Sequence, residues 1–247
     1  MSHETIEIRT EDGTCPAHVF RPSSGRGPWP AVLFYMDAFG VRPALASMAE
    51  RLASHGYVVA VPNLYYRSGA YAPFDSSKVF TEGPERDRFK GMIASISDAK
   101  VMRDTSAVLE ALDRLPFVRP GSIAAVGYCM GGGFALSAAG TFPDRVVTAA
   151  SFHGGGLAND KPDSPHLLAS KMRARVYVGA AGIDPSFTPD QEARLKRTFD
   201  DAGVKYMLER YEGAKHGFAV TGHPVYDRDA SDRHWQVLLR QLQADLS

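Results

Sequence analysis

The segment 122–139 constrains the fold more than any other part of the chain. Residues 123–126 form a short, partly β-branched apolar run, which predicts a buried strand, and residues 134–139 predict a buried helix. Gly127-Tyr-Cys-Met-Gly131 joins them. Glycines two positions before and after Cys129 permit the close backbone approach of a sharp strand-to-helix turn. The pattern therefore predicts that Cys129 is presented at the start of a helix.

A cysteine at such a turn is suited to nucleophilic catalysis. A helix N-terminus and a nearby histidine both favour the thiolate, which is the reactive form of cysteine. The next amide, the N–H of Met130, points at the same place and would bind a developing oxyanion. The other interpretation is a glycine-rich helix start with a small core cysteine. Five residues alone do not separate the two, because short motifs also match by chance.

Charge and cysteine content limit the classes of partner and compartment. The 28 basic and 28 acidic residues cancel, so nothing favours nucleic acid or a membrane as partner. The N-terminal residues show no signal peptide, and no apolar stretch suggests a membrane span. The two cysteines do not make a disulfide framework. We therefore expect a cytoplasmic enzyme that acts on small molecules and is either a monomer or a homodimer.

Strands that alternate with helices after an initial hairpin predict one α/β domain over 1–247. The hairpin is expected to pair 5–9 with 15–20. The other strands are expected at 30–35, 57–61, 123–126, 146–152, 173–179 and 205–211, and the helices at 43–55, 98–112 (with Asp98 as N-cap), 134–139, 189–202 and 228–246. This rhythm is typical of a mainly parallel sheet with helices on both faces. Residues 63–97 are weakly patterned and are expected to form a cap-like excursion.

Three reactive residues, Cys129, Asp184 and His216, follow separate expected strands in that order. Sites form at the carboxyl ends of such strands, and nucleophile, acid, histidine is the order of the α/β-hydrolase fold. His216 would take the thiol proton and later protonate the leaving group, while Asp184 orients the imidazole. Each also has a plainer interpretation, as a loop histidine and as a turn residue before Pro185. Asp190 is an alternative acid, although a helix N-terminus would account for it.

The loop after the strand at 30–35 should supply the second oxyanion donor, and the N–H of Ala38 is the candidate. Asp37 would then lie beside the nucleophile. A carboxylate there would repel a thiolate or accept the thiol proton. The plainer interpretation is a helix-capping or loop acid that faces water.

With these residues in place, the chain resembles the dienelactone hydrolase family. The matching segments are Asp37-Ala-Phe-Gly-Val41, Gly56-Tyr-Val-Val-Ala-Val-Pro-Asn-Leu-Tyr65, Gly127-Tyr-Cys-Met-Gly-Gly132, Gly182-Ile-Asp184 and Ala214-Lys-His-Gly-Phe218. They occur in the family's order through nearly the whole chain.

The resemblance implies an α/β-hydrolase fold, a Cys129–His216–Asp184 triad, no metal or other cofactor, and hydrolysis of an ester or lactone through a thioester. It also implies a thiol-modulating role for Asp37, since the family's acid at this position is thought to hold the resting thiol and receive its proton. That family acid is a glutamate, and Asp37 is one methylene shorter.

The chain departs from the family at its anion-binding positions. Val220 stands where members that act on dienelactone have an arginine, four residues after the histidine. Arg88, with Arg86 close by, matches a second anion-binding arginine, although a solvated charge run explains both equally well. Met92 replaces a tyrosine expected soon after. Loss of a bidentate carboxylate clamp points to a less anionic ester or lactone in an apolar pocket. The side chains expected to line that pocket are Phe39, Tyr65, Tyr66 and Val220.

A different class of function stays open from the sequence. A ligand-binding or thiol-redox-sensing protein on the same fold, without turnover, would also explain the shortened acid and the missing arginine, because fold does not fix function.

Overall fold

The computed structural model describes residues 2–75 and 78–247, and its centre is an eight-stranded sheet. The strands are β1 (Ser2–Thr10), β2 (Gly13–Arg21), β3 (Trp29–Tyr35), β4 (Val58–Pro62), β5 (Val118–Tyr128), β6 (Val146–Phe152), β7 (Arg175–Ile183) and β8 (Tyr206–Lys215). Their spatial order is β1-β2-β4-β3-β5-β6-β7-β8. The β1–β2 hairpin is antiparallel, β2 runs antiparallel to β4, and β3 to β8 are mutually parallel. The expected hairpin and mainly parallel sheet are thus confirmed.

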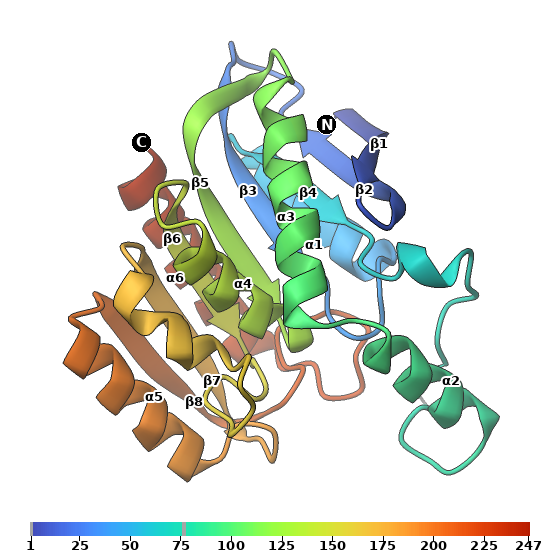
Figure 1. Cartoon of the computed structure of the whole chain (residues 1–247), viewed down its shortest axis with the longest axis vertical. Helices are drawn as coiled ribbons and strands as arrows, with labels where there is room; N and C mark the ends of the chain where they lie inside the picture. The colour runs from blue at the N-terminus through green and yellow to red at the C-terminus, as the bar shows by residue number, and fades with distance from the viewer. Residues whose placement is uncertain (1, 76–77) are drawn as a thin grey trace.

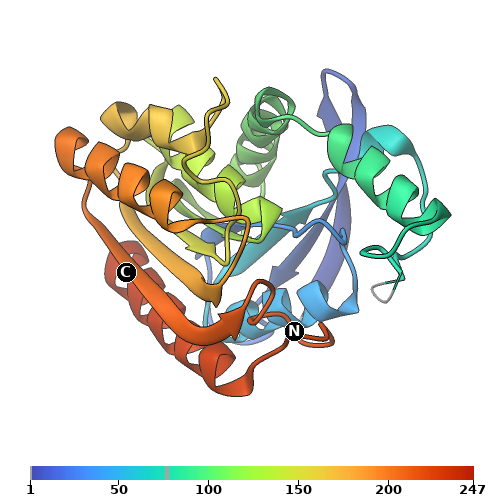
Figure 2. The ribbon, with the colours of Figure 1, turned by 90° about the horizontal axis from the view of Figure 1, so that it is seen from below.

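Helices cover both faces of this sheet (Figures 1 and 2). The first face carries α3 (Asp98–Asp113), α4 (Met130–Thr141) and α5 (Pro189–Ala202), and the other carries α1 (Pro43–Ser54) and α6 (Arg228–Leu246). Apolar residues recur every three or four positions along α1 and α6, and these faces are buried against the strands. The architecture is the α/β-hydrolase fold. Among the described residues, no helix is long and apolar enough to cross a membrane.

The observed element boundaries agree best with the expected ones where the sequence itself carries clear start and stop signals, such as proline and glycine. The strand at 146–152 and the helices at 189–202 and 228–246 occupy the expected residues. The expected N-cap of α3 was wrong. Ser97 is extended, and its hydroxyl accepts the N–H of Lys100 at 3.3 Å, so Asp98 is the first helical residue instead.

The excursion at 63–97 contains a short 3₁₀ turn, η1 (Tyr66–Ser68), and a helix that the sequence did not predict, α2 (Pro84–Ala94). Residues 76 and 77 lie outside the described residues. Phe89 of α2 and Val79 are buried in a small apolar cluster with Ala38 and Phe39. The α2 helix therefore lies at the end of the sheet where the parallel strands terminate (Figure 1).

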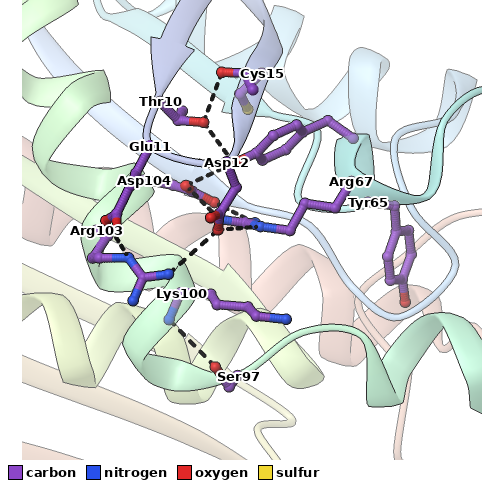
Figure 3. A network of polar contacts seen from close by, with 12 residues as sticks. Thr10, Glu11, Asp12, Cys15, Tyr65, Arg67, Ser97, Lys100, Arg103 and Asp104 are labelled. Carbon is purple, nitrogen blue, oxygen red and sulfur yellow. Dashed lines mark hydrogen bonds and ion pairs between the residues drawn. The ribbon is translucent and has the colours of Figure 1, made fainter.

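A charged network fixes the start of this excursion to the rest of the fold (Figure 3). The guanidinium of Arg67 donates two 2.8 Å hydrogen bonds to the buried carboxylate of Asp104 on α3, and it also pairs with Asp12 in the β1–β2 turn. The hydroxyl of Tyr66 donates to Asp104 at 3.0 Å. Cys15 lies near this network and is fully buried, and burial raises the pKa of its thiol to about 12. We infer that Cys15 is a packing residue and an inert thiol.

Candidate active site

Cys129 stands at a strained turn between β5 and α4. Its backbone has φ 54° and ψ −120°, an uncommon conformation for a residue with a side chain. A Cβ on Gly127 would lie 1.9 Å from the carbonyl oxygen of Gly131, and one on Gly131 would lie 2.5 Å from that of Tyr35. Both positions therefore require glycine. The turn costs on the order of 1–3 kcal/mol of backbone strain, which the surrounding packing must offset.

The turn is held from two sides. The N–H of Cys129 donates to the carbonyl of Phe152 at the end of β6, at 3.1 Å. On the other face, the hydroxyl of Tyr128 lies 2.9 Å from Nε2 of His234 on α6, and Nδ1 of His234 lies 2.7 Å from the carbonyl oxygen of Ser231. A carbonyl only accepts, so Nδ1 carries the proton and Nε2 accepts from Tyr128. Burial lowers the pKa of His234 to about 3, so this link is a neutral one.

Asp184 and His216, from the loops after β7 and β8, are brought into a hydrogen bond. Asp184 Oδ2 lies 2.7 Å from His216 Nδ1, and the carboxylate is 1% exposed. Ser186 donates its N–H and its hydroxyl to the other oxygen, at 2.8 and 2.6 Å. Burial acts to raise the pKa of Asp184, but the hydrogen bonds from His216 and Ser186 outweigh it and keep that pKa below its usual value. Asp190 lies exposed in the first turn of α5, so the geometry favours Asp184 as the acid.

His216 faces Cys129 in one cavity. Burial acts to lower the pKa of His216, yet the hydrogen bond to Asp184 and the influence of the neighbouring Cys129 outweigh burial and raise that pKa to about 10. The imidazolium is therefore the favoured form at neutral pH, flanked by an acid on one side and the sulfur on the other. Such a ring is placed to hold the proton that the thiol gives up.

Asp37 lies at the cavity wall, but its carboxylate is held by an arginine. Arg42 donates to its two oxygens at 2.5 and 2.7 Å, and the N–H of Phe39 donates to Oδ1 at 3.0 Å. The pair neutralises the charge that would otherwise repel a thiolate. To take the thiol proton, Asp37 would have to leave Arg42, so the geometry favours His216 for this step.

The loop that carries Ala38 is fixed by Tyr65. The buried hydroxyl of Tyr65 donates to the carbonyl of Ala38 at 2.7 Å, and the N–H of Gly40 donates to the carbonyl of Asp37 at 3.1 Å. Tyr65 is therefore a support for this turn and not part of the cavity wall, contrary to the expected substrate contact. The N–H groups of Ala38 and Met130 remain the candidate oxyanion donors.

The cavity has a volume of about 620 Å³ and combines the reactive groups with an apolar wall. Phe39, expected from the sequence, contributes to that wall. The other apolar members are Ala38, Phe80, Phe89, Ile93, Met130, Pro185 and Val225, and the excursion supplies three of these.

Four other expected substrate contacts lie elsewhere. Val220 is buried away from the cavity. The guanidinium of Arg88 pairs with Glu85, donates to the carbonyls of residues 72 and 73 and stacks on Phe74, which turns it toward its own loop. Arg86 lies 3.7 Å from the exposed Glu82. Tyr66, as described above, serves the network around Asp104.

Four residues of the site were missed from the sequence. Arg42 and Ser186 hold the two carboxylates, and two histidines, His153 and His223, line the cavity beside His216. The histidine after β6 had a usable signal, since it follows a parallel strand as Asp184 and His216 do. The others depend on loop conformations that no local pattern specifies. Among the described residues, no cluster of three or more His, Cys, Asp or Glu side chains is arranged to hold a metal.

Comparison with known proteins shows the family of this chain. The model of the dienelactone hydrolase family matches residues 15–246. The chain belongs to this family. A carboxymethylenebutenolidase of a Pseudomonas species is 33% identical over 220 residues, covering 89% of this chain and 85% of that protein. The family is one of ester and lactone hydrolases, and this dienelactone hydrolase family member is accordingly a carboxylic ester hydrolase.

Solved structures share the fold of this family member. A Klebsiella pneumoniae protein provisionally assigned as a dienelactone hydrolase has a TM-score of 0.86 at 23% identity, over 98% of both chains. A dienelactone hydrolase-like promiscuous phosphotriesterase from metagenomic libraries has a TM-score of 0.80 at 23% identity, over the full length of both.

Proposed function

We propose that this hydrolase cleaves uncharged or weakly anionic carboxylic esters or lactones through a thioester on Cys129. The observation that carries the proposal is the His216 ring, which is hydrogen-bonded to Asp184 at 2.7 Å and shares a cavity with Cys129. Cys129 stands at the sharp turn between β5 and α4, which we call the nucleophile elbow. The side chains that would serve as nucleophile, base and orienting acid thus share one cavity, which supports acyl transfer as the reaction.

In the first half-reaction the sulfur of Cys129 attacks the carbonyl carbon while His216 holds the thiol proton. The N–H groups of Met130 and Ala38 would bind the oxyanion of the tetrahedral intermediate, Met130 as the first residue of α4, whose N–H has no acceptor within the helix. When the intermediate collapses, His216 passes its proton to the leaving oxygen. An ester then releases its alcohol, whereas a lactone keeps the new hydroxyl tethered to the acyl chain.

In the second half-reaction His216 must change from acid to base. Part of the rise in the pKa of His216 comes from Cys129. In the thioester the sulfur is uncharged, so this contribution disappears and the pKa of the imidazole falls. The neutral ring then takes a proton from water, whose oxygen attacks the thioester and releases the carboxylic acid.

The lining of the cavity favours substrates without a carboxylate. None of the described residues that line it is an arginine, and its single lysine, Lys161, is exposed. Arg42 is committed to Asp37. The wall is mainly aromatic and aliphatic, which suits an apolar acyl or alcohol group.

Activity toward p-nitrophenyl esters of several acyl lengths tests the reaction. We expect Cys129→Ala and brief iodoacetamide treatment to abolish turnover, while Cys15→Ala, the matched control at the buried thiol, retains it. Equal turnover by wild type and Cys129→Ala would refute the thioester route. Substrate charge is tested by comparing neutral aryl esters with dienelactone, and a large preference for dienelactone would refute that part. Family membership favours hydrolysis over the non-catalytic alternative.

A further inference from the structure

His153 is a histidine of the cavity that the proposed mechanism does not use. It follows β6 directly, so it lies at the same end of the sheet as Cys129, Asp184 and His216. Its φ of 39° is uncommon for a residue with a side chain, and its N–H is held by the carbonyl of Gly179 at 2.7 Å. The backbone is thus fixed in a conformation that is uncommon in general and is found more often near active sites.

The ring of His153 is buried without a hydrogen-bond partner. It is 1% exposed, and it packs edge-to-face on His216 and Phe218 with ring centroids 5.3 and 5.2 Å apart. Within the part of the chain that the structure describes, neither Nδ1 nor Nε2 has a partner. Buried polar side-chain atoms are nearly always paired, so two orphaned nitrogens on one ring beside the nucleophile need an explanation.

The charge state of the ring limits what it can bind. Burial, followed by repulsion from His216, lowers the pKa of His153 well below its usual range. The ring is therefore neutral, with one nitrogen that donates and one that accepts. A neutral donor–acceptor pair suits a hydroxyl or carbonyl oxygen better than a carboxylate, which would favour a charged arginine.

We propose that His153 binds an uncharged oxygen function of the substrate, a hydroxyl or a second carbonyl close to the scissile bond. The proposal rests on the proposed function and narrows it to esters or lactones that carry such a group. Among the described residues, none of the rings that pack on His153 is hydrogen-bonded to it, and the cavity that it lines is the place from which a partner can come. His223 also lines the cavity, its Nδ1 has no partner among residues 2–75 and 78–247, and it would border the same part of the substrate.

Isosteric ester pairs test this contact. One pair places the hydroxyl on the acyl side, p-nitrophenyl 3-hydroxybutyrate against p-nitrophenyl 3-methylbutyrate. The other places it on the alcohol side, 2-hydroxyethyl butyrate against propyl butyrate. In the wild type we expect the hydroxylated member of one pair to have a kcat/KM roughly three- to ten-fold higher, the size of one net neutral hydrogen bond. In His153→Phe that ratio should fall to about 1 through KM, and His153→Gln should restore part of it.

Val225→Ala is the control, because it changes the apolar wall and should affect both members of a pair alike. A wild-type ratio near 1 in both pairs would overturn the proposal. The proposal would also be overturned if His153→Phe lowered kcat/KM by the same factor for both esters of a pair. The ring would then only support His216. Binding can be tested separately from turnover, in case the thioester route itself fails. The ligands are the corresponding ketones, in which a methylene replaces the ester oxygen, and calorimetry compares their affinities for Cys129→Ala and Cys129→Ala/His153→Phe. The hydroxylated ketone should lose its advantage in the second variant.

Discussion

The buried histidine beneath the nucleophile elbow should make the protein sensitive to acid. His234 is fully buried, accepts from Tyr128 and has a pKa of about 3, against an ordinary value of 6.5. Its pKa is lowered in the folded state, so the stability it contributes is complete above pH 6.5 and is lost as the pH falls toward 3. Well inside that window each pH unit costs about 1.4 kcal/mol, and lowering the pH from 7.5 to 4.5 costs about 2.7 kcal/mol.

The measurement is urea unfolding of wild type and His234→Gln between pH 7.5 and 4.5. Circular dichroism is a better signal than tryptophan fluorescence. The ring of Trp235 lies 4.7 Å from that of His234, so its fluorescence would change with the local charge and not only with unfolding. Carboxylates titrate in both proteins and cancel in the difference. We expect the free energy of unfolding to fall more steeply in the wild type, by about 1.4 kcal/mol per pH unit below 6.5. Parallel curves would refute the reasoning, whatever the stability of the variant at neutral pH.

Three further predictions concern the site itself. Asp184→Asn removes the largest contribution that raises the pKa of His216, so the alkaline limb of kcat/KM, expected near pH 10, should move to lower pH; an unmoved limb would contradict the assignment. Gly127→Ala should destabilise the fold by more than about 3 kcal/mol in urea unfolding, since its Cβ meets backbone at 1.9 Å, whereas Gly133→Ala in α4, with 3.7 Å of clearance, should not. Arg42→Ala leaves the charge of Asp37 unpaired, so it should destabilise the fold by about 3–5 kcal/mol and slow the alkylation of Cys129. The double variant Arg42→Ala/Asp37→Asn should recover stability and alkylation rate, and losses that simply add in the double variant would contradict this.

The elbow was predictable because its constraints are local. Gly127 and Gly131 are required by contacts within a few residues and with the adjacent strand β3. The residue types on either side of the turn predict a strand followed by a helix. Asp184 and His216 were placed by a topological rule, since side chains after parallel strands meet at one edge of the sheet. That rule brings the two loops to the same edge, and the loop conformations then set the 2.7 Å hydrogen bond between the side chains.

The contacts of the loops were not predictable in the same way. The α2 helix has little apolar periodicity of its own and depends on the packing of Phe89 under the excursion. The position of Arg88 in the sequence matches an anion-binding arginine, yet its guanidinium forms an ion pair with Glu85, three residues earlier in the chain. Asp37 lines the same cavity as Cys129, but its partner Arg42 is set by a turn conformation that the residue types leave open.

The central claim is that Cys129 carries the acyl group during turnover. The most direct measurement is rapid acid quenching of wild type during hydrolysis of a p-nitrophenyl ester, followed by peptide mass spectrometry. The account predicts the mass of the acyl group on the peptide that contains Cys129 and on no peptide of Cys129→Ala. Steady turnover with an unmodified Cys129 at every quench time, or an acyl group on another residue, would contradict it.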